Sequence, residues 1–160
     1  MYKKGILLCI IAAFMTLIAC SNAKEAESFS SKEEALEYYI EKENIQGMMV
    51  LIHTTSGDQI LISEYREDLY HLGELLTMDH SFSTIKLTEM TSFKNSPGGI
   101  MEFSTSNGMD YTIKFDNEEH VHSVSLPDNK FHISIVEEHV LSKMPYVTTA
   151  AIESIEIIKN

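Results

Sequence analysis

Apolar segments alternate with short turns along most of the chain, a pattern typical of antiparallel β-hairpins. Segments near 99–105 and 109–115 are joined by a Ser-Asn-Gly loop that ends at Gly108. A three-residue loop opposes Phe103 to Tyr111 and keeps the apolar face whole, whereas a two-residue Asn-Gly turn would mix the two faces. The pattern therefore predicts a hairpin with the three-residue loop.

An earlier hairpin carries apolar residues on both of its faces. A three-residue loop that ends at Gly57 pairs Val50 with Ile62 on one face and Leu51 with Leu61 on the other. Strands that are apolar on both faces are buried on both faces. The sequence therefore predicts that this hairpin is covered from both sides.

Further strands fill most of the remaining sequence. A turn at 127–130 predicts a third hairpin, and the segments 68–77 and 82–90 have the composition of two more strands. The run 69–77 also fits a helix, so both assignments stay open. A last strand is expected over 151–158.

One helix is predicted ahead of the strands. Ser31 and Glu34 have the spacing of a capping box, in which each side chain satisfies a backbone amide at a helix N-terminus. Apolar residues follow at helical spacing, and glutamates at four-residue steps form a second face that we expect to be solvated rather than to bind a cation. The apolar positions are Ala35, Leu36, Tyr39 and Ile40, and the acidic ones are Glu33, Glu37 and Glu41. The helix should end near Asn44.

These elements together predict an α+β fold in a single globular domain over 31–160. One N-terminal helix packs on an antiparallel β-meander of about eight or nine strands. The meander forms either a sandwich or a partly open barrel, and the pattern of turns does not decide between the two.

The first residues have the three zones of a secretory signal. Lys3 and Lys4 precede the apolar stretch 5–19, which is shorter than the roughly 20 residues that a bilayer-spanning helix needs. The stretch ends in Leu17-Ile18-Ala19-Cys20, which resembles the lipobox of bacterial lipoproteins. The resemblance implies a signal peptide over 1–19, cleavage before Cys20 and a diacylglyceryl group on its sulfur. Two acyl chains are enough for stable anchoring, whereas one chain is not.

Cleavage there would leave a strongly acidic chain of 141 of the 160 residues. The 12 Lys and Arg less the two lysines of the leader, against 24 Asp and Glu, give a net charge of −14. Such a domain is repelled by nucleic acid and by anionic lipid headgroups, so the lipid alone would hold it at the membrane. The small polar segment 20–30 would be a flexible tether. Since Cys9 leaves with the leader, the domain would contain no disulfide.

Three segments of the first half of the domain resemble a group of small uncharacterised lipoproteins of low-GC Gram-positive bacteria. They are Ser31 to Ile45, the hairpin segment 57–62, and 70–75 (Tyr-His-Leu-Gly-Glu-Leu). The resemblance implies a location at the outer, extracytoplasmic face of the cell membrane. It implies no activity.

Histidines suggest a metal site as one alternative. His120 and His122 are two residues apart, so on a strand both would point to one face, and His139 lies on the neighbouring strand region. Imidazole and carboxylate ligands suit zinc. The expected register provides one histidine pair rather than three ligands, so we favour surface or half-buried histidines and expect no metal or other cofactor.

The sequence contains few features that would indicate an enzyme. The sequence has no Gly-x-Ser-x-Gly elbow and no phosphate-binding glycine loop, and Ser92, Ser96 and Ser104 are ordinary strand or loop residues. A pair of carboxylates of the glycosidase type stays open, because sequence does not show their separation in space. The loop 95–99 (Asn-Ser-Pro-Gly-Gly) is typical of a connection between strands, with a binding edge as the alternative.

The sequence therefore favours a membrane-anchored, non-enzymatic domain that binds an envelope protein or peptide. The alternative is a metal-binding or hydrolytic lipoprotein that uses the segment of His120 and His122. Convergence of these histidines with His139 would favour the alternative. An open sheet edge or an exposed apolar patch would favour the binding domain.

Overall fold

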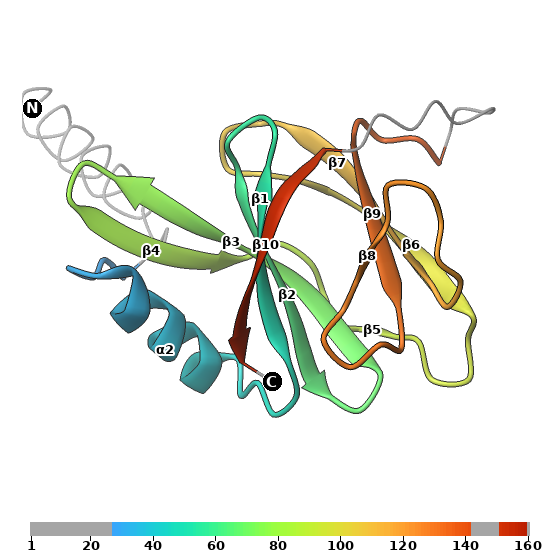
Figure 1. Ribbon diagram of the computed structural model, residues 1–160. Coiled ribbons are helices and arrows are strands. Elements are labelled where there is room, and N and C mark those ends of the chain that lie inside the picture. Colours follow the sequence, from blue (N-terminus) through green and yellow to red (C-terminus); the bar gives the residue numbers. More distant parts are fainter. Residues whose placement is uncertain (1–26, 142–150, 160) are drawn as a thin grey trace, which may run out of the picture.

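Two antiparallel β-sheets and one helix make up the described residues, 27–141 and 151–159, of the computed structural model (Figure 1). Sheet A has the strand order β10-β1-β2-β3-β4, and β5 pairs with β3. Its strands are β1 (Met49–Thr54), β2 (Gln59–Arg66), β3 (Leu69–Met78), β4 (Ser81–Lys86), β5 (Thr91–Ser92) and β10 (Ile152–Lys159).

Sheet B has the order β6-β7-β9-β8 and lies across the inner face of sheet A. Its strands are β6 (Gly98–Ser104), β7 (Asp110–Asp116), β8 (Val124–Ser125) and β9 (His132–Glu137). The helix α2 (Lys32–Lys42) covers the other face of sheet A beneath the β3–β4 hairpin, which extends beyond the two-sheet body (Figure 1).

The predicted hairpin registers are confirmed. Leu51 opposes Leu61, and Phe103 opposes Tyr111. Gly57 and Gly108 have φ angles of +89° and +85°, the left-handed conformation that a glycine at the end of a three-residue loop provides at no steric cost. Both faces of the first hairpin are covered, because sheet B lies on one side and α2 on the other.

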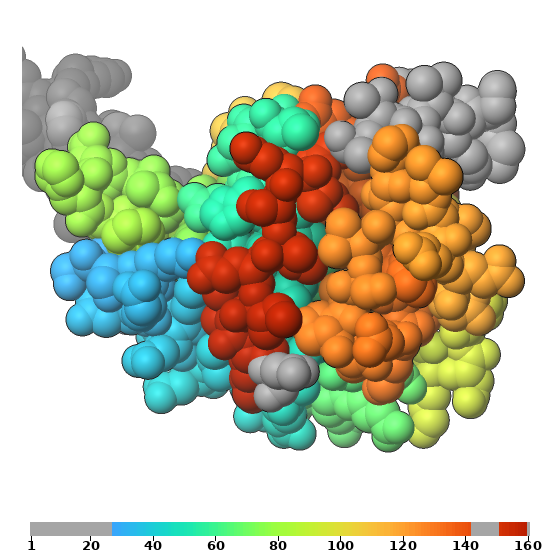
Figure 2. Space-filling model, in the orientation of Figure 1, coloured from blue at the N-terminus to red at the C-terminus, as the bar shows by residue number. Residues whose placement is uncertain are grey.

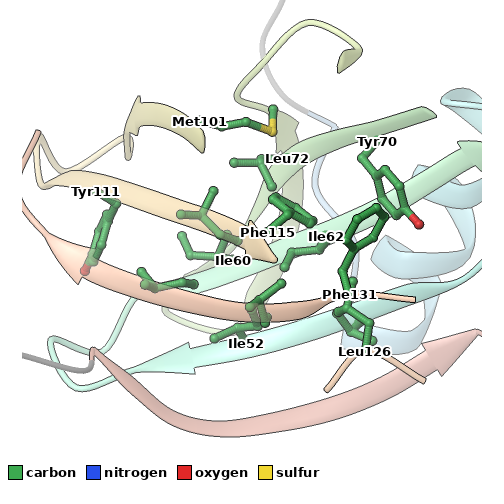
Figure 3. Packing of buried hydrophobic residues seen from close by; sticks show 14 of the residues in the cluster. Ile52, Ile60, Ile62, Tyr70, Leu72, Met101, Tyr111, Phe115, Leu126 and Phe131 are labelled. Carbon is green, nitrogen blue, oxygen red and sulfur yellow. The ribbon is translucent and has the colours of Figure 1, made fainter. Parts of the chain in front are cut away.

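The main core lies between the two sheets and is shown in Figure 3. It contains the residues of β1 and β2 that alternate with those under α2, and an aromatic group at one end. Its largest members include Ile52, Ile60, Ile62, Tyr70, Leu72, Tyr111, Ile113 and Phe115. A second, smaller core lies under the helix and includes Leu36, Tyr39, Leu51, Leu61 and Leu75.

Several details of the expected architecture are wrong. The described residues form ten strands rather than eight or nine, because the short strands β5 and β8 also pair. The chain is also not a single meander, since β7 pairs with β9 and β10 returns to β1. The two sheets are not closed, which agrees with the open alternatives that the sequence left. The open assignment of 69–77 resolves as strand β3, because Leu72 and Leu75 alternate between two buried faces.

One residue ahead of Ser31 also contacts sheet A. Phe29 exchanges two backbone hydrogen bonds with Phe82 at the edge of β4, and its ring lies 4.9 Å from that of Tyr38. Phe29 belongs to the segment that the sequence predicts as a tether, so at least this residue of the segment is held against the sheet. The leader 1–19 and Cys20 lie outside the described residues. No helix within the described ranges is both long and apolar enough to cross a membrane.

The expected helix cap is present and gives a stability prediction. The Ser31 hydroxyl accepts a hydrogen bond of 3.2 Å from the backbone N–H of Glu34. We expect Ser31→Ala to lower the free energy of unfolding by about 1 kcal/mol, because it leaves that N–H without its partner. Urea denaturation measures the change. Glu37→Ala, on the exposed face of the same helix, should change stability by less than about 0.5 kcal/mol and serves as the control.

Candidate functional site

An unpaired strand edge is the feature of this fold that best suits binding, and the outer strands of the two sheets differ in how much edge they offer. The edge of β10 is open to solvent on the face shown in Figure 2. Register shifts interrupt its pairing with β1 near both ends, and it carries Glu153, Glu156 and Lys159. Bulges and charges of this kind protect an edge from further pairing.

Two other outer strands offer little edge. Phe29 already occupies the backbone groups of Phe82 on β4. Strand β8 has only two residues. Strand β6 is longer, with seven residues, and within the described residues it pairs with β7 alone.

The direction of the backbone groups of β6 follows from the bonds at its two ends. Asn117 donates its N–H to the carbonyl of Pro97, and Thr105 donates to Met109, each over 2.9 Å. Since hydrogen-bonded and non-bonded pairs alternate along an antiparallel ladder, every second residue between these ends turns its N–H and C=O away from β7. These residues are Gly98, Ile100, Glu102 and Ser104.

Only the first of these residues is satisfied locally. The Ser96 hydroxyl donates to the Gly98 carbonyl over 2.6 Å and accepts from the Gly98 N–H over 3.3 Å. In the described part of the chain no group bonds to the N–H or C=O of Ile100, Glu102 or Ser104. Among residues 27–141 and 151–159, these six backbone groups are therefore left free to bind a further strand.

A shallow depression of about 150 Å³ adjoins the start of this edge. Gly98 contributes to it by having no side chain. A Cβ at this position would come 2.0 Å from the carbonyl oxygen of Phe115, and the φ angle of +143° is also one that only glycine adopts readily. The depression is lined by Pro97, Gly98, Gly99, Ile100, Lys114, Phe115 and Asp116.

A small charged cluster borders the depression. Asp116 forms ion pairs with Lys114, at 2.5 Å, and with the Nε2 atom of His120, at 2.9 Å. Hydrogen bonds from Lys114, from the backbone N–H of Glu118 and from His120 hold the pKa of Asp116 well below its usual range. The carboxylate therefore stays ionised at the rim of the depression, with its charge compensated by these donors.

A serine, a histidine and an aspartate lie in one row beside the cluster. Asp116 opposes His132, and His132 opposes Ser125, whose hydroxyl lies 3.0 Å from the Nδ1 atom of His132. The row resembles a hydrolytic triad only in its order. Asp116 bonds Lys114 and His120 rather than His132, so the contact that orients the base in a triad is not made.

The expectation that His120 and His122 share a strand is wrong. They lie in the exposed segment between β7 and β8, where His122 has a φ angle of +70° and the Ser123 hydroxyl accepts the N–H of His120. Val121 is the one apolar residue among 117–123 and is exposed, so the segment has no apolar face to bury and forms a turn instead of extending the strand.

The third histidine is far from the other two. His139 lies 3.7 Å from Asp110 at one end of β7, whereas His120 bonds Asp116 at the other end. Within 27–141 and 151–159, no three His, Cys, Asp or Glu side chains are arranged to hold a metal ion.

Sequence reasoning finds part of this site. The sequence offered a binding edge as the alternative interpretation of the loop 95–99. The two glycines of this loop line the depression, so they are the sequence signal that could have located it. The free edge of β6 has no sequence signal, because it depends on which strands become neighbours. Comparison with protein-family models, with curated proteins and with solved structures found no match for this chain.

Proposed function

We propose that this protein is a lipid-anchored domain on the extracytoplasmic face of the cell membrane that binds an extended peptide segment of an envelope protein. The peptide adds to β6 as a further strand of sheet B. The observation that carries the proposal is that six backbone groups of Ile100, Glu102 and Ser104 have no partner among the residues that the structure describes. In strand addition, main-chain hydrogen bonds supply the affinity and neighbouring side-chain sites supply the specificity.

The anchor and the edge are compatible in space. The leader pattern that ends at Cys20 supports an anchor ahead of the domain. The first described residues meet the molecule at Phe29, beside the projecting β3–β4 hairpin, whereas the start of β6 is on the opposite side (Figure 1). A domain tethered through Phe29 presents β6 away from the bilayer.

Charge restricts the class of peptide. The domain without its leader carries a net charge of −14, so a basic segment is attracted and an acidic one is repelled. The depression next to Ile100 is lined by glycine, proline and aliphatic atoms as well as by the Lys114–Asp116 pair. It fits one apolar side chain of a basic, extended peptide.

Selection from a displayed peptide library, with the lipid-free domain as bait, provides the ligand for the test. We expect the selected peptides to be basic. We also expect them to lack proline at every second position, where the peptide N–H must bond to β6. On binding, hydrogen exchange should slow at the amides of Ile100, Glu102 and Ser104, because these N–H groups become bonded. Binding that protects amides elsewhere, or a library that gives no binder, would contradict the proposal.

A proline substitution tests the edge directly. The Glu102 N–H points away from β7, so Glu102→Pro removes a donor from the edge without breaking the β6–β7 ladder. We expect roughly tenfold weaker binding of a selected peptide, measured by calorimetry, for the loss of one hydrogen bond. Glu102→Ala is the matched control, since it loses the same carboxylate but keeps the N–H, and it should bind nearly as the wild type does. Equal affinities of the two variants would exclude β6 as the binding edge.

A further inference from the structure

A group of buried polar side chains under α2 has no function in peptide binding. His71 on β3, Tyr39 on α2 and Ser63 on β2 have exposed fractions of 0%, 1% and 0%. In the described part of the chain neither nitrogen of His71 has a hydrogen-bond partner, and the Tyr39 and Ser63 hydroxyls make only a long contact with each other rather than a well-formed hydrogen bond. Buried polar atoms without partners are rare and costly, so three such residues together call for an explanation.

The fold brings these three residues to one place. Ser63 opposes His71 in the β2–β3 ladder, so the two side chains lie on the same face of sheet A. The ring of Tyr39 lies 5.9 Å from that of His71. Its hydroxyl occupies the space over Gly73, where a Cβ would come within 2.3 Å of the oxygen. The helix α2 therefore packs on the cluster through Tyr39, and we call this packed position the seat of the helix.

The charged groups near His71, taken together with its burial, do not favour a positive charge on its imidazole. Lys86 on β4 and Glu43, which caps α2, form an ion pair of 3.2 Å at the margin of the cluster. Burial, and to a smaller extent the charge of Lys86, lower the pKa of His71 to about 4, and Glu43 opposes the shift. At neutral pH the imidazole is therefore uncharged.

We propose that His71 makes the seat of α2 acid-sensitive: the helix is held on sheet A at neutral pH and is released locally when His71 is protonated. A buried imidazolium needs an acceptor for each of its two N–H groups, and within the described residues neither the Tyr39 hydroxyl nor the Ser63 hydroxyl bonds a nitrogen of His71. Separation of α2 from the sheet exposes His71 to water, which removes the cost of the buried charge.

The direction of the pH dependence follows from linkage. With α2 released, His71 has its ordinary pKa of 6.5, and with α2 seated its pKa is about 4. The released state therefore binds more protons as the pH falls below 6.5, and the seated state is fully favoured only above that value. Between pH 8 and pH 4.5 the equilibrium for seating should fall roughly 80-fold.

Release of α2 would act on the tether. Phe29 contacts Tyr38 of the helix and directly follows the segment that leads from Cys20. If the proposed anchor is correct, release of the helix together with loss of the two Phe29–Phe82 backbone bonds lengthens the chain between lipid and sheets from about 9 to about 24 residues. The root-mean-square reach of such a chain rises from roughly 17 Å to roughly 27 Å.

Besides the Glu43–Lys86 pair, a further titratable contact of α2 must be separated from His71. Lys32 on the helix bonds Glu156 on β10, which also lies 3.8 Å from His53. The hydrogen bond from Lys32 lowers the pKa of Glu156, so this contact also weakens in acid. Glu156→Gln removes that titration and leaves His71 in place.

Hydrogen exchange of the lipid-free domain at pH 7 and pH 4.5 tests the inference independently of the anchor and of peptide binding. Protection factors, which are corrected for intrinsic exchange, should fall by tens of fold for α2 in the wild type and in Glu156→Gln. They should change by less than threefold in His71→Gln, which does not titrate. His71→Leu serves in its place if the glutamine variant does not fold.

Two results would overturn the inference. One is an acid response of α2 that persists in the His71 variants. The other is equal loss of protection at pH 4.5 in the central strands β1 and β2, which would show global acid unfolding in place of local release.

Discussion

Phe115→Ala is expected to lower the free energy of unfolding by about 4 kcal/mol, the largest effect among the substitutions considered. The side chain of Phe115 is 1% exposed and lies between the two sheets (Figure 3). Its ring is 4.8 Å from that of Phe93, 5.6 Å from that of Tyr70 and 6.2 Å from that of Phe131. Truncation removes all these contacts and leaves a cavity that the surrounding packed rings cannot easily close.

Urea denaturation followed by circular dichroism measures this loss. Val121→Ala is the control, because Val121 is 84% exposed and its truncation should change stability by less than about 0.5 kcal/mol. A loss below about 2 kcal/mol for Phe115→Ala would mean that the aromatic group is not packed as described. Both variants should retain the native circular dichroism spectrum in the absence of urea.

Gly98→Ala is expected to cost about 3 kcal/mol, although it adds a single methyl group. The φ angle at Gly98 is +143°, and the new Cβ would lie 2.0 Å from the backbone oxygen of Phe115. A backbone atom in a paired strand cannot rotate away as a flexible side chain can. The substitution therefore strains the β6–β7 ladder at the point where the depression begins.

Gly57→Ala isolates the steric part of this cost. Gly57 also has a positive φ angle, of +89°, but no atom lies within 4 Å of the position that a Cβ would take. This control should lose only about 1 kcal/mol, the ordinary cost of a left-handed alanine. Thermal denaturation of the two variants gives the difference, and equal losses would show that the Phe115 carbonyl yields without cost. Gly98→Ala should also weaken binding of a selected peptide, because it displaces Ile100 and Lys114.

Local patterns are sufficient to predict the hairpins. The pairing of Leu51 with Leu61 and of Phe103 with Tyr111 follows from loop length and from the need to keep apolar side chains on one face. The cap at Ser31 follows in the same way from residues three apart. These features depend on neighbours in the sequence, so the sequence contains the information that determines them.

The pattern of apolar residues and turns does not predict which strands distant in sequence pair with each other. Nothing in the spacing of turns shows that β10 pairs with β1, or that β7 pairs with β9 and leaves β6 at the edge of sheet B. Strand β8 is shorter than its pattern indicates for the same reason: His120 and His122 alternate as strand residues do, but no neighbour covers them.

The sequence alone determined the local elements, the acidic surface and the expectation of an anchor at Cys20, since each of these depends on residue types within a short window or on composition. The tertiary structure decided the free edge of β6 and the burial of His71 beneath Tyr39. Both result from the order in which strands assemble, and that order is set by the free energy of packing the whole chain rather than by any one segment.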